Sequence, residues 1–159
     1  MHTLYLLLGS NIGDSSLKLE NAIVFIEKKI GIVKKKSSLY ATAAWGNVQQ
    51  NDFINQVILV QTTLTASEVL TQIFGIEQKM GRVRTYKNAA REIDIDILFF
   101  DEAIIETNTL TIPHKEIQNR KFVLQPMNEI APTLLHPVLK KDITTLLNIC
   151  TDALNVQKI

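Results

Sequence analysis

The stretch EIDIDIL, residues 92–98, alternates two aspartates with isoleucines. Because side chains two residues apart in a β-strand share a face, this alternation predicts a strand over residues 93–100. The isoleucines would face the core, while Asp94 and Asp96 would lie together on the opposite face. Aspartate is uncommon in strands and like charges on one face repel, so the pair lowers stability unless a cation lies nearby.

Two amphipathic helices and three further strands are predicted before this stretch. Residues 19–30 and 69–80 each repeat apolar side chains at helical spacing, which predicts one buried stripe per helix. Thr65 and Glu68 fit a capping box at the start of the second helix. Apolar runs or alternation predict strands over residues 3–8, 32–40 and 53–61, with a turn at 9–11 and the lysines of 34–36 at an exposed or edge position.

The resulting order is strand, helix, strand, strand, helix, strand, which matches the ferredoxin-like split βαβ pattern. We therefore predict an α+β fold with a ferredoxin-like antiparallel sheet and helices packed on its faces. After residue 100 the pattern is less periodic, with a turn near Pro113 and helical stretches in 115–131 and 142–149. Pro126, Pro132 and Pro137 are expected to interrupt these stretches.

Length and composition exclude several classes of protein. The chain has 159 residues, 46% of them hydrophobic and 21% charged, which predicts one globular domain over 1–159. The net charge of +1 gives no general attraction to nucleic acid or to an anionic membrane. The apolar runs are too short to span a membrane, and no signal peptide is recognisable at the N-terminus. The single cysteine, Cys150, fits a reducing compartment, so we expect a cytoplasmic protein.

A basic segment immediately precedes the Asp-x-Asp strand. Residues 81–91 contain Arg82, Arg84, Lys87 and Arg91 and no acid. Alone, this segment is typical of a solvated loop, and Asp-x-Asp alone is typical of the solvated face of a strand. Together they offer carboxylates for Mg²⁺ and guanidinium groups for phosphate oxygens, which favours a nucleotide site.

Three more polar residues are candidates for the same site. His114 and Arg120 could contact phosphates, and His114 could alternatively transfer a proton or cap a helix start. Glu77 lies at the margin of the apolar stripe of the second helix. It could accept hydrogen bonds from a ligand, or it could be an ordinary exposed glutamate.

The strand predicted over 53–61 carries an amide within an apolar face. Asn55 shares that face with Phe53, and a buried amide needs hydrogen-bond partners such as the edge of a heterocycle. Phe53, Trp45 and Phe122 could stack on a flat ligand, although core packing is the simpler interpretation of each aromatic residue taken singly.

Taken together, these motifs resemble the 6-hydroxymethyl-7,8-dihydropterin pyrophosphokinase family over nearly the whole chain. The Arg-x-x-Asp-x-Asp-Ile strand, followed by Pro-His and Asn-Arg-x-Phe, is the specific part of the likeness. The matching stretches are LGSNIGD at 8–14, YAT at 40–42, DFIN at 52–55, GRVR at 81–84, REIDIDI at 91–97, PH at 113–114 and NRKFVL at 119–124.

The resemblance implies transfer of pyrophosphate from ATP to the pterin, giving the pterin diphosphate and AMP in folate biosynthesis. It implies a monomer that binds ATP, the pterin and two Mg²⁺ ions, with 43–51 and 82–92 closing as lids. By the resemblance, Asp94 and Asp96 hold the metal and are catalytic together with Arg82 and Arg91; Glu77, Arg84, Arg91, Ile97, Thr111, His114 and Arg120 bind ATP; and Thr42, Ala43, Trp45, Phe53, Asn55 and Phe122 bind the pterin.

Among the departures of the sequence from the family pattern, two fall in the segments expected to close as lids. KNAA at 87–90 replaces a stretch that usually carries an aromatic residue, glycine and proline, and Ala43 and Ala44 replace two prolines. These changes leave open a second hypothesis, a catalytically weak nucleotide- or pterin-binding module on the same fold. A third hypothesis, an RNA-binding domain, is disfavoured because the strands lack the Gly-aromatic stacking signature.

Overall fold

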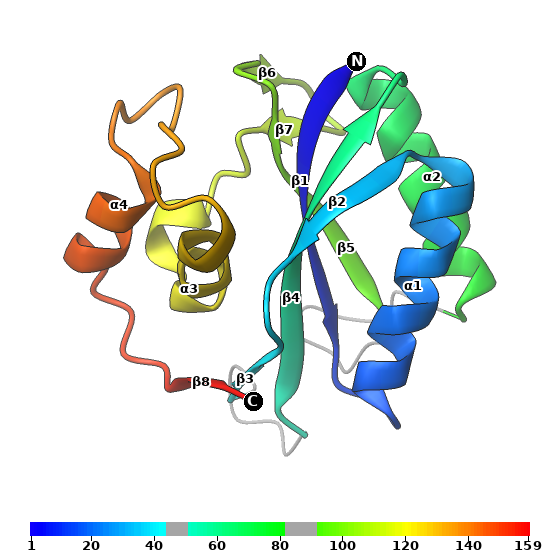
Figure 1. The fold of residues 1–159 in the computed structure, drawn as a ribbon, viewed down its shortest axis with the longest axis horizontal. Coiled ribbons are helices and arrows are strands. Elements are labelled where there is room, and N and C mark those ends of the chain that lie inside the picture. Colours follow the sequence, from blue (N-terminus) through cyan, green and yellow to red (C-terminus); the bar gives the residue numbers. More distant parts are fainter. Residues whose placement is uncertain (44–50, 82–91) are drawn as a thin grey trace.

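The structure is a computed structural model that describes residues 1–43, 51–81 and 92–159. Its elements follow the predicted alternation and add short ones near the C-terminus (Figure 1). In chain order they are β1 (His2–Ser10), α1 (Ser15–Lys29), β2 (Ile32–Lys36), β3 (Tyr40–Thr42), β4 (Phe53–Thr62), α2 (Ala66–Lys79), β5 (Asp94–Phe100), β6 (Ile105–Glu106), β7 (Thr111–Ile112), the 3₁₀ turn Ile117–Asn119, α3 (Lys121–Ile130), α4 (Ile143–Ile149) and β8 (Val156–Lys158).

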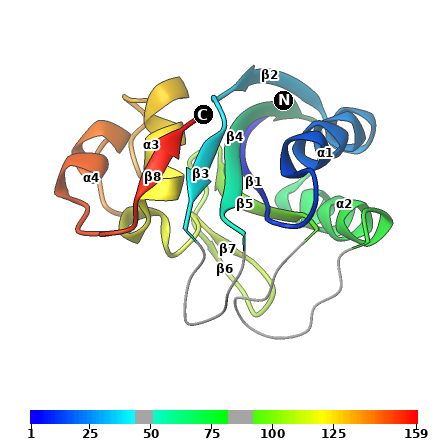
Figure 2. The ribbon, with the colours of Figure 1, turned by 90° about the horizontal axis from the view of Figure 1, so that it is seen from below.

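The main sheet runs in the order β5-β1-β4-β3-β8, and β2 also pairs with β4. All of these pairings are antiparallel. Helices α1 and α2 cover one face, while α3 and α4 lie on the other, so the sheet forms the middle layer (Figures 1 and 2). This arrangement confirms the predicted α+β, ferredoxin-like antiparallel sheet with helices on its faces.

One apolar core lies between the sheet and α1 and α2. Alternate residues of β1 and β5 face it, and the predicted stripes of both helices contribute Leu19, Ile26, Val69 and Ile73. Asp14 caps the start of α1. At the start of α2 the predicted capping box of Thr65 and Glu68 is present.

The second core lies between the sheet and α3 and α4, and a β-bulge shapes it. The register of β1 with β5 shifts between Tyr5 and Leu6, so Leu98 is the extra residue of β5. As a result Leu98 and Phe99 both belong to this core, although they are neighbours in sequence. The other helix-side members include Val123, Leu124 and Met127 of α3 and Ile143 and Leu146 of α4.

Several boundaries differ from the sequence prediction. Strand β1 continues through Gly9 and Ser10 instead of turning there. The strand predicted over 32–40 is divided into β2 and β3, although the lysines of 34–36 are exposed on it as expected. Pro126 lies inside α3 and does not end it. The short strands β6, β7 and β8 were not predicted.

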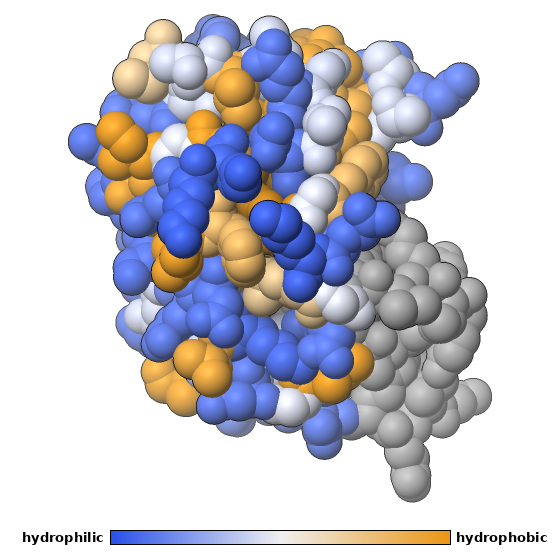
Figure 3. Space-filling view, turned by 90° about the vertical axis from the view of Figure 1, so that its right-hand side faces the viewer, coloured by the Kyte–Doolittle hydropathy of each residue, from blue (hydrophilic) through white to orange (hydrophobic). Residues whose placement is uncertain are grey.

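The surface over α1 and α2 is mainly hydrophilic, with scattered apolar side chains (Figure 3). These include Leu17, Val24 and Phe74, which are exposed at separate positions. Within the described ranges, none of the helices has the length and apolar character needed to cross a bilayer.

We expect a buried histidine to make the stability of the protein depend on pH. His136 is 4% exposed, its Nδ1 accepts hydrogen bonds from the N–H groups of Val138 and Leu139, and burial lowers its pKa below 6.5. The unfolded chain therefore binds a proton at a higher pH than the folded chain does. This contribution to the free energy of unfolding is complete above pH 6.5 and is lost as the pH falls towards the lowered pKa.

The substitution His136→Asn tests this expectation because the amide oxygen replaces the acceptor but does not titrate. Urea unfolding at pH 7.5 and 5.0 should show a smaller loss of stability on acidification in the variant than in the wild type. Each unit of pKa difference is equivalent to about 1.4 kcal/mol. Equal losses in the two proteins would show that His136 does not contribute.

Candidate active site

A row of residues crosses four strands on the face of the sheet that α3 and α4 cover in part. In the register of the sheet, Gly9 of β1 is paired with Asp94 of β5 on one side and with Asn55 of β4 on the other. Asn55 is in turn paired with Tyr40 of β3. Paired residues in an antiparallel sheet point to the same face, so Asp94 and Asn55 flank a glycine that carries no side chain.

The two aspartates lie as the alternation predicts. Asp94 and Asp96 are half-buried on the face of α3, while the isoleucines at 93, 95 and 97 are buried in the core on the other face. Leu7 is paired with Asp96, one step along the sheet from the row of Gly9. The carboxylates therefore follow each other along one edge strand at the end of the second core.

Gly9 provides the space in which the Asn55 side chain lies. A Cβ atom on Gly9 would come within 2.7 Å of Oδ1 of Asn55, closer than a carbon can normally approach. The Asn55 side chain is buried, with 5% of the residue exposed. The glycine thus permits a buried amide to lie across the sheet beside the aspartates.

An unsatisfied hydroxyl lies on the neighbouring strand. Thr42 of β3 is paired with Phe53 of β4 and is buried. Among the described residues, its Oγ1 atom has no hydrogen-bond partner. Because a buried hydroxyl without a partner is costly, this atom fits a position where a polar ligand group binds.

Aromatic rings are available on the same side of the sheet. Phe53 precedes Asn55 by two residues on β4, and Phe122 is the second residue of α3. Both are half-buried, so part of each ring surface is open to a ligand. The guanidinium carbon of Arg120 lies 5.5 Å from the centre of the Phe122 ring. Ala43, which follows β3, is exposed.

His114 lies close to the charged groups of the site. Burial and the positive charge of Arg120 lower its pKa, and the negative charges of Glu116 and Asp94 oppose this effect. Its Nδ1 atom accepts a hydrogen bond from the N–H of Glu116 at 3.1 Å. A neutral His114 therefore carries its proton on Nε2 and can donate a hydrogen bond from that atom.

Glu77 is buried, so the interpretation as an ordinary exposed glutamate is wrong. Only 3% of the residue is exposed, and one carboxylate oxygen accepts a hydrogen bond from the N–H of Ile95 at 3.0 Å. Since β5 is an edge strand of the described sheet, no strand among the described residues lies beside this N–H on that side. Glu77 thus connects α2 to the strand that carries the two aspartates.

The structure describes only some of the other predicted site residues. Ile97 is 5% exposed and packs into the core of α1 and α2, which leaves little of its side chain accessible to a nucleotide. Thr111 is exposed on β7, opposite Glu106. The predictions for Arg82, Arg84, Arg91 and Trp45, and for most of the two expected lids, fall on residues outside the described ranges.

The sequence interpretation missed the role of Gly9 and of the residues after it. Ser10 and Asn11 are buried polar residues at the end of β1, and the Asn11 amide donates a hydrogen bond to the carbonyl of Asn51 at 3.3 Å. The signal that could have identified Gly9 is its register with Asn55, which depends on how the strands pair and not on local sequence.

The side chains available as metal ligands limit the kind of metal that the site could bind. Within the described part of the chain, no group of three or more His, Cys, Asp or Glu residues could enclose a metal ion. Asp94 and Asp96 therefore offer two carboxylates and no complete cage. Such a site fits Mg²⁺, which is commonly held by one or two carboxylates together with water and substrate phosphates.

Comparisons with known proteins indicate the family of this chain. The family model for 7,8-dihydro-6-hydroxymethylpterin-pyrophosphokinase matches residues 5–132. A 2-amino-4-hydroxy-6-hydroxymethyldihydropteridine pyrophosphokinase from Aquifex aeolicus is 39% identical over 141 residues, which cover 89% of this chain and 88% of that protein. The folic acid synthesis protein fol1 of Schizosaccharomyces pombe is 38% identical over 134 residues, 84% of this chain but 18% of that protein.

A solved structure shows the same fold. The crystal structure of wild-type Plasmodium falciparum HPPK-DHPS superposes with a TM-score of 0.74 at 21% identity, covering 93% of this chain and 43% of that one. Three findings support one assignment: the match of the family model, the similarity to the Aquifex relative and the observed fold. The chain belongs to the 7,8-dihydro-6-hydroxymethylpterin-pyrophosphokinase family.

Proposed function

We propose that this protein catalyses Mg²⁺-dependent transfer of the β,γ-pyrophosphoryl group of ATP to 6-hydroxymethyl-7,8-dihydropterin. The hydroxymethyl oxygen forms a bond to the β-phosphorus, and the bond from that phosphorus to the α,β-bridging oxygen breaks. AMP leaves with the bridging oxygen, the hydroxyl proton is released, and the pterin diphosphate is the second product.

The observation that carries this proposal is the row formed by Asp94, Gly9 and Asn55. Neighbouring strands lie about 4.8 Å apart, so the backbones of Asp94 and Asn55 are separated by roughly 10 Å. A site for phosphate and metal on β5 and a site for the pterin edge on β4 are thus adjacent, with no side chain of β1 between them. Such proximity and orientation of two substrates is the main requirement of phosphoryl transfer.

Asp94 and Asp96 would hold two Mg²⁺ ions together with the phosphates of ATP. When bound, the ions supply positive charge that neutralises the triphosphate. The two carboxylates fix where that charge lies because both are on one rigid strand, whose position Glu77 secures through Ile95. Cations bound at the two carboxylates would lower the like-charge repulsion between them.

The cationic and donor groups would orient the triphosphate. His114 acts in this proposal as a neutral donor from Nε2, since its Nδ1 is already occupied by the N–H of Glu116. Arg120 adds a guanidinium group beside it, and the basic segment before β5 would supply others. The proposed ATP contacts are Glu77, Arg84, Arg91, Thr111, His114 and Arg120, together with Ile97, which would contact ATP through its main chain because its side chain is buried. Arg82 and Arg91 would stabilise the charge that develops during transfer.

The pterin would bind between Phe53 and Phe122, with its polar edge toward Asn55 and Thr42. Two observations support this position: the buried Asn55 amide carries both a donor and an acceptor that a pterin edge can match, and Oγ1 of Thr42 has no hydrogen-bond partner among the described residues. Ala43 and Trp45 complete the proposed set of pterin contacts.

We further propose that residues 1–159 act as one domain and work as a monomer in the cytoplasm. In this proposal the partners are the two small-molecule substrates, and neither nucleic acid nor a membrane takes part. Size-exclusion chromatography with light scattering distinguishes a monomer from a dimer directly.

Product analysis tests the proposed reaction. The protein is incubated with ATP, Mg²⁺ and the pterin, and parallel reactions omit the pterin or contain EDTA. We expect AMP to form in step with the pterin diphosphate, and only when pterin and Mg²⁺ are both present. ADP as the product would contradict the reaction, and binding of both ligands without turnover would indicate the binding-module hypothesis.

A further inference from the structure

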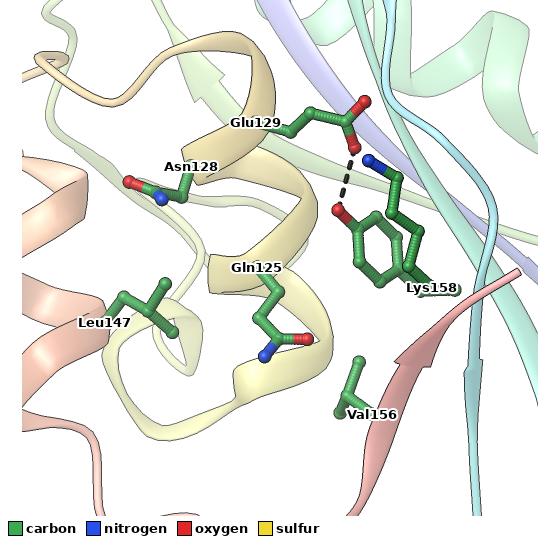
Figure 4. A pocket seen from close by; sticks show the side chains of 7 residues that line it. Gln125, Asn128, Glu129, Leu147, Val156 and Lys158 are labelled. Atoms are coloured by element: carbon green, nitrogen blue, oxygen red, sulfur yellow. Dashed lines mark hydrogen bonds between the residues drawn. The ribbon is translucent and has the colours of Figure 1, made fainter.

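An open hollow separates α3 from the nearby edge of the sheet. It has a volume of about 470 Å³ and lies between α3, α4, β3 and β8 (Figure 4). Close apolar packing therefore does not set the spacing between helix and strands at this point. The residues that line it are Tyr40, Gln125, Asn128, Glu129, Leu147, Val156 and Lys158.

A polar connection bridges the two sides of this hollow. Glu129, near the end of α3, accepts hydrogen bonds from the hydroxyl of Tyr40 at 2.7 Å, the hydroxyl of Ser38 at 2.9 Å and the N–H of Ser38 at 3.0 Å. Figure 4 shows the bond to the tyrosine. One carboxylate thus receives three donors from β3 and the residues that lead into it.

The ionisation of both partners maintains this connection. Burial and the neighbouring Glu129 raise the pKa of Tyr40 to about 12, so its hydroxyl remains a donor in any ordinary buffer. Burial raises the pKa of Glu129, but hydrogen bonds from Tyr40 and Ser38 and the charge of Lys158 outweigh that effect and lower it. Glu129 therefore remains a carboxylate at neutral pH.

The connected elements are those that carry the proposed pterin contacts. Phe122 precedes Glu129 by seven residues, so the two lie on the same face of α3, two turns and about 10 Å apart. On the strand side, Tyr40 is paired with Asn55, and Thr42 is paired with Phe53. Any change in the spacing of α3 and β3 at Glu129 would therefore be transmitted to the gap between Phe122 and Phe53.

We propose that Glu129 is a positioning residue for the pterin site, acting through Tyr40 and Ser38. It holds α3 at the distance from β3 and β4 at which a pterin fits between Phe122 and Phe53. This inference rests on the proposed function, because it assumes that the pterin binds between those rings. Glu129 itself does not touch either substrate.

Binding measurements on Glu129→Ala and Tyr40→Phe test the inference. The pterin is titrated in the presence of Mg²⁺ and a non-hydrolysable ATP analogue, and the analogue is titrated separately. We expect Glu129→Ala, which removes all three of the hydrogen bonds from Tyr40 and Ser38, to weaken pterin binding about tenfold and to change analogue binding by less than about twofold. Tyr40→Phe should have a smaller effect of the same kind, and kinetics should show a raised KM for the pterin with kcat largely retained.

Thr144→Val is the matched control. The Thr144 hydroxyl of α4 donates to the Asn128 side chain at 2.7 Å, so this variant also removes a hydrogen bond from the end of α3, but one that points away from β3. We expect a fall in the thermal midpoint with pterin affinity unchanged. If Thr144→Val weakened pterin binding as much as Glu129→Ala, the effect would be one of general stability and the inference would be wrong.

The remaining outcomes also decide the matter. Unchanged pterin affinity in Tyr40→Phe and Glu129→Ala would overturn the inference while leaving the proposed function intact. If Glu129→Ala failed to fold, Tyr40→Phe alone would decide, because it removes only a hydroxyl. Failure of the wild type to bind the pterin would overturn the proposed function and this inference with it, and product analysis would show that independently.

Discussion

Substituting Asp96 by asparagine should reduce kcat/KM by about a thousandfold, the order of effect seen when a preorganised charge-stabilising group is lost. The amide has the shape of the carboxylate but carries no negative charge, so it holds a divalent cation poorly. Asp96 is half-buried on β5 and opposite Leu7 in the sheet. Because asparagine keeps the shape of aspartate at this half-buried position of β5, the fold should be retained.

Glu102→Gln is the control for the loss of a carboxylate. Glu102 is exposed in the turn that follows β5, and its replacement should leave both activity and stability unchanged. Initial rates over a range of Mg²⁺ and ATP concentrations, with circular dichroism melts, measure both quantities. An Asp96→Asn variant that kept more than about a tenth of the wild-type kcat/KM would contradict the proposed metal site.

Replacing Gly9 by alanine should weaken pterin binding by about 10- to 100-fold, equivalent to the 1–3 kcal/mol cost of an unsatisfied polar group. The added Cβ would lie 2.7 Å from Oδ1 of Asn55, and because it is fixed to the backbone the amide must move. The amide is the end of a flexible side chain, so the fold should be retained. ATP affinity should change by less than about twofold, since the displaced group reads the pterin.

Gly75→Ala provides a matched glycine control. Gly75 lies within α2, and apart from the backbone of the helix itself no atom of the described residues lies within 4 Å of the position of an added Cβ. Alanine there should raise the stability by about 0.5–1 kcal/mol through its helix propensity and leave pterin affinity unchanged. Isothermal titration of the pterin into each variant measures the effect. Wild-type affinity in Gly9→Ala would show that Asn55 does not read the pterin.

The strands and helices that were predicted correctly are those determined by local sequence. The alternation at 92–98 predicted both β5 and which of its side chains face the core. The capping box at Thr65 and Glu68 marked the start of α2, and both of its hydrogen bonds are present. In each case the residues that determine the element lie within a few positions of one another.

The break between β2 and β3 has a non-local cause. The Ser37 hydroxyl accepts a hydrogen bond from the N–H of Val57, and the Gln56 amide donates to the carbonyl of Ser37. These side chains replace regular ladder bonds where the strand is interrupted. Strand β8 also depends on a distant contact. Its three residues pair with β3, which lies more than a hundred positions away in the sequence.

The candidate site likewise combines features that local sequence predicts with features that depend on contacts between distant positions. The chemical types of the site were visible in the sequence, because acidic, basic and aromatic residues are recognisable wherever they occur. The burial of Glu77 could not be predicted from the sequence, because it depends on β5 being an edge strand that presents the N–H of Ile95. The contacts of Glu129 with Ser38 and Tyr40 join positions about ninety residues apart, as their separations of 91 and 89 show.

The most direct test of the account is a crystal structure of the protein with Mg²⁺, a non-hydrolysable ATP analogue and the pterin. We predict metal at Asp94 and Asp96, the triphosphate beside His114 and Arg120, and the pterin between Phe53 and Phe122 with its edge at Asn55. The hydroxymethyl oxygen should face the β-phosphorus across Gly9. A pterin bound elsewhere, such as in the hollow beside Glu129, or metal without contact to either aspartate, would contradict the account.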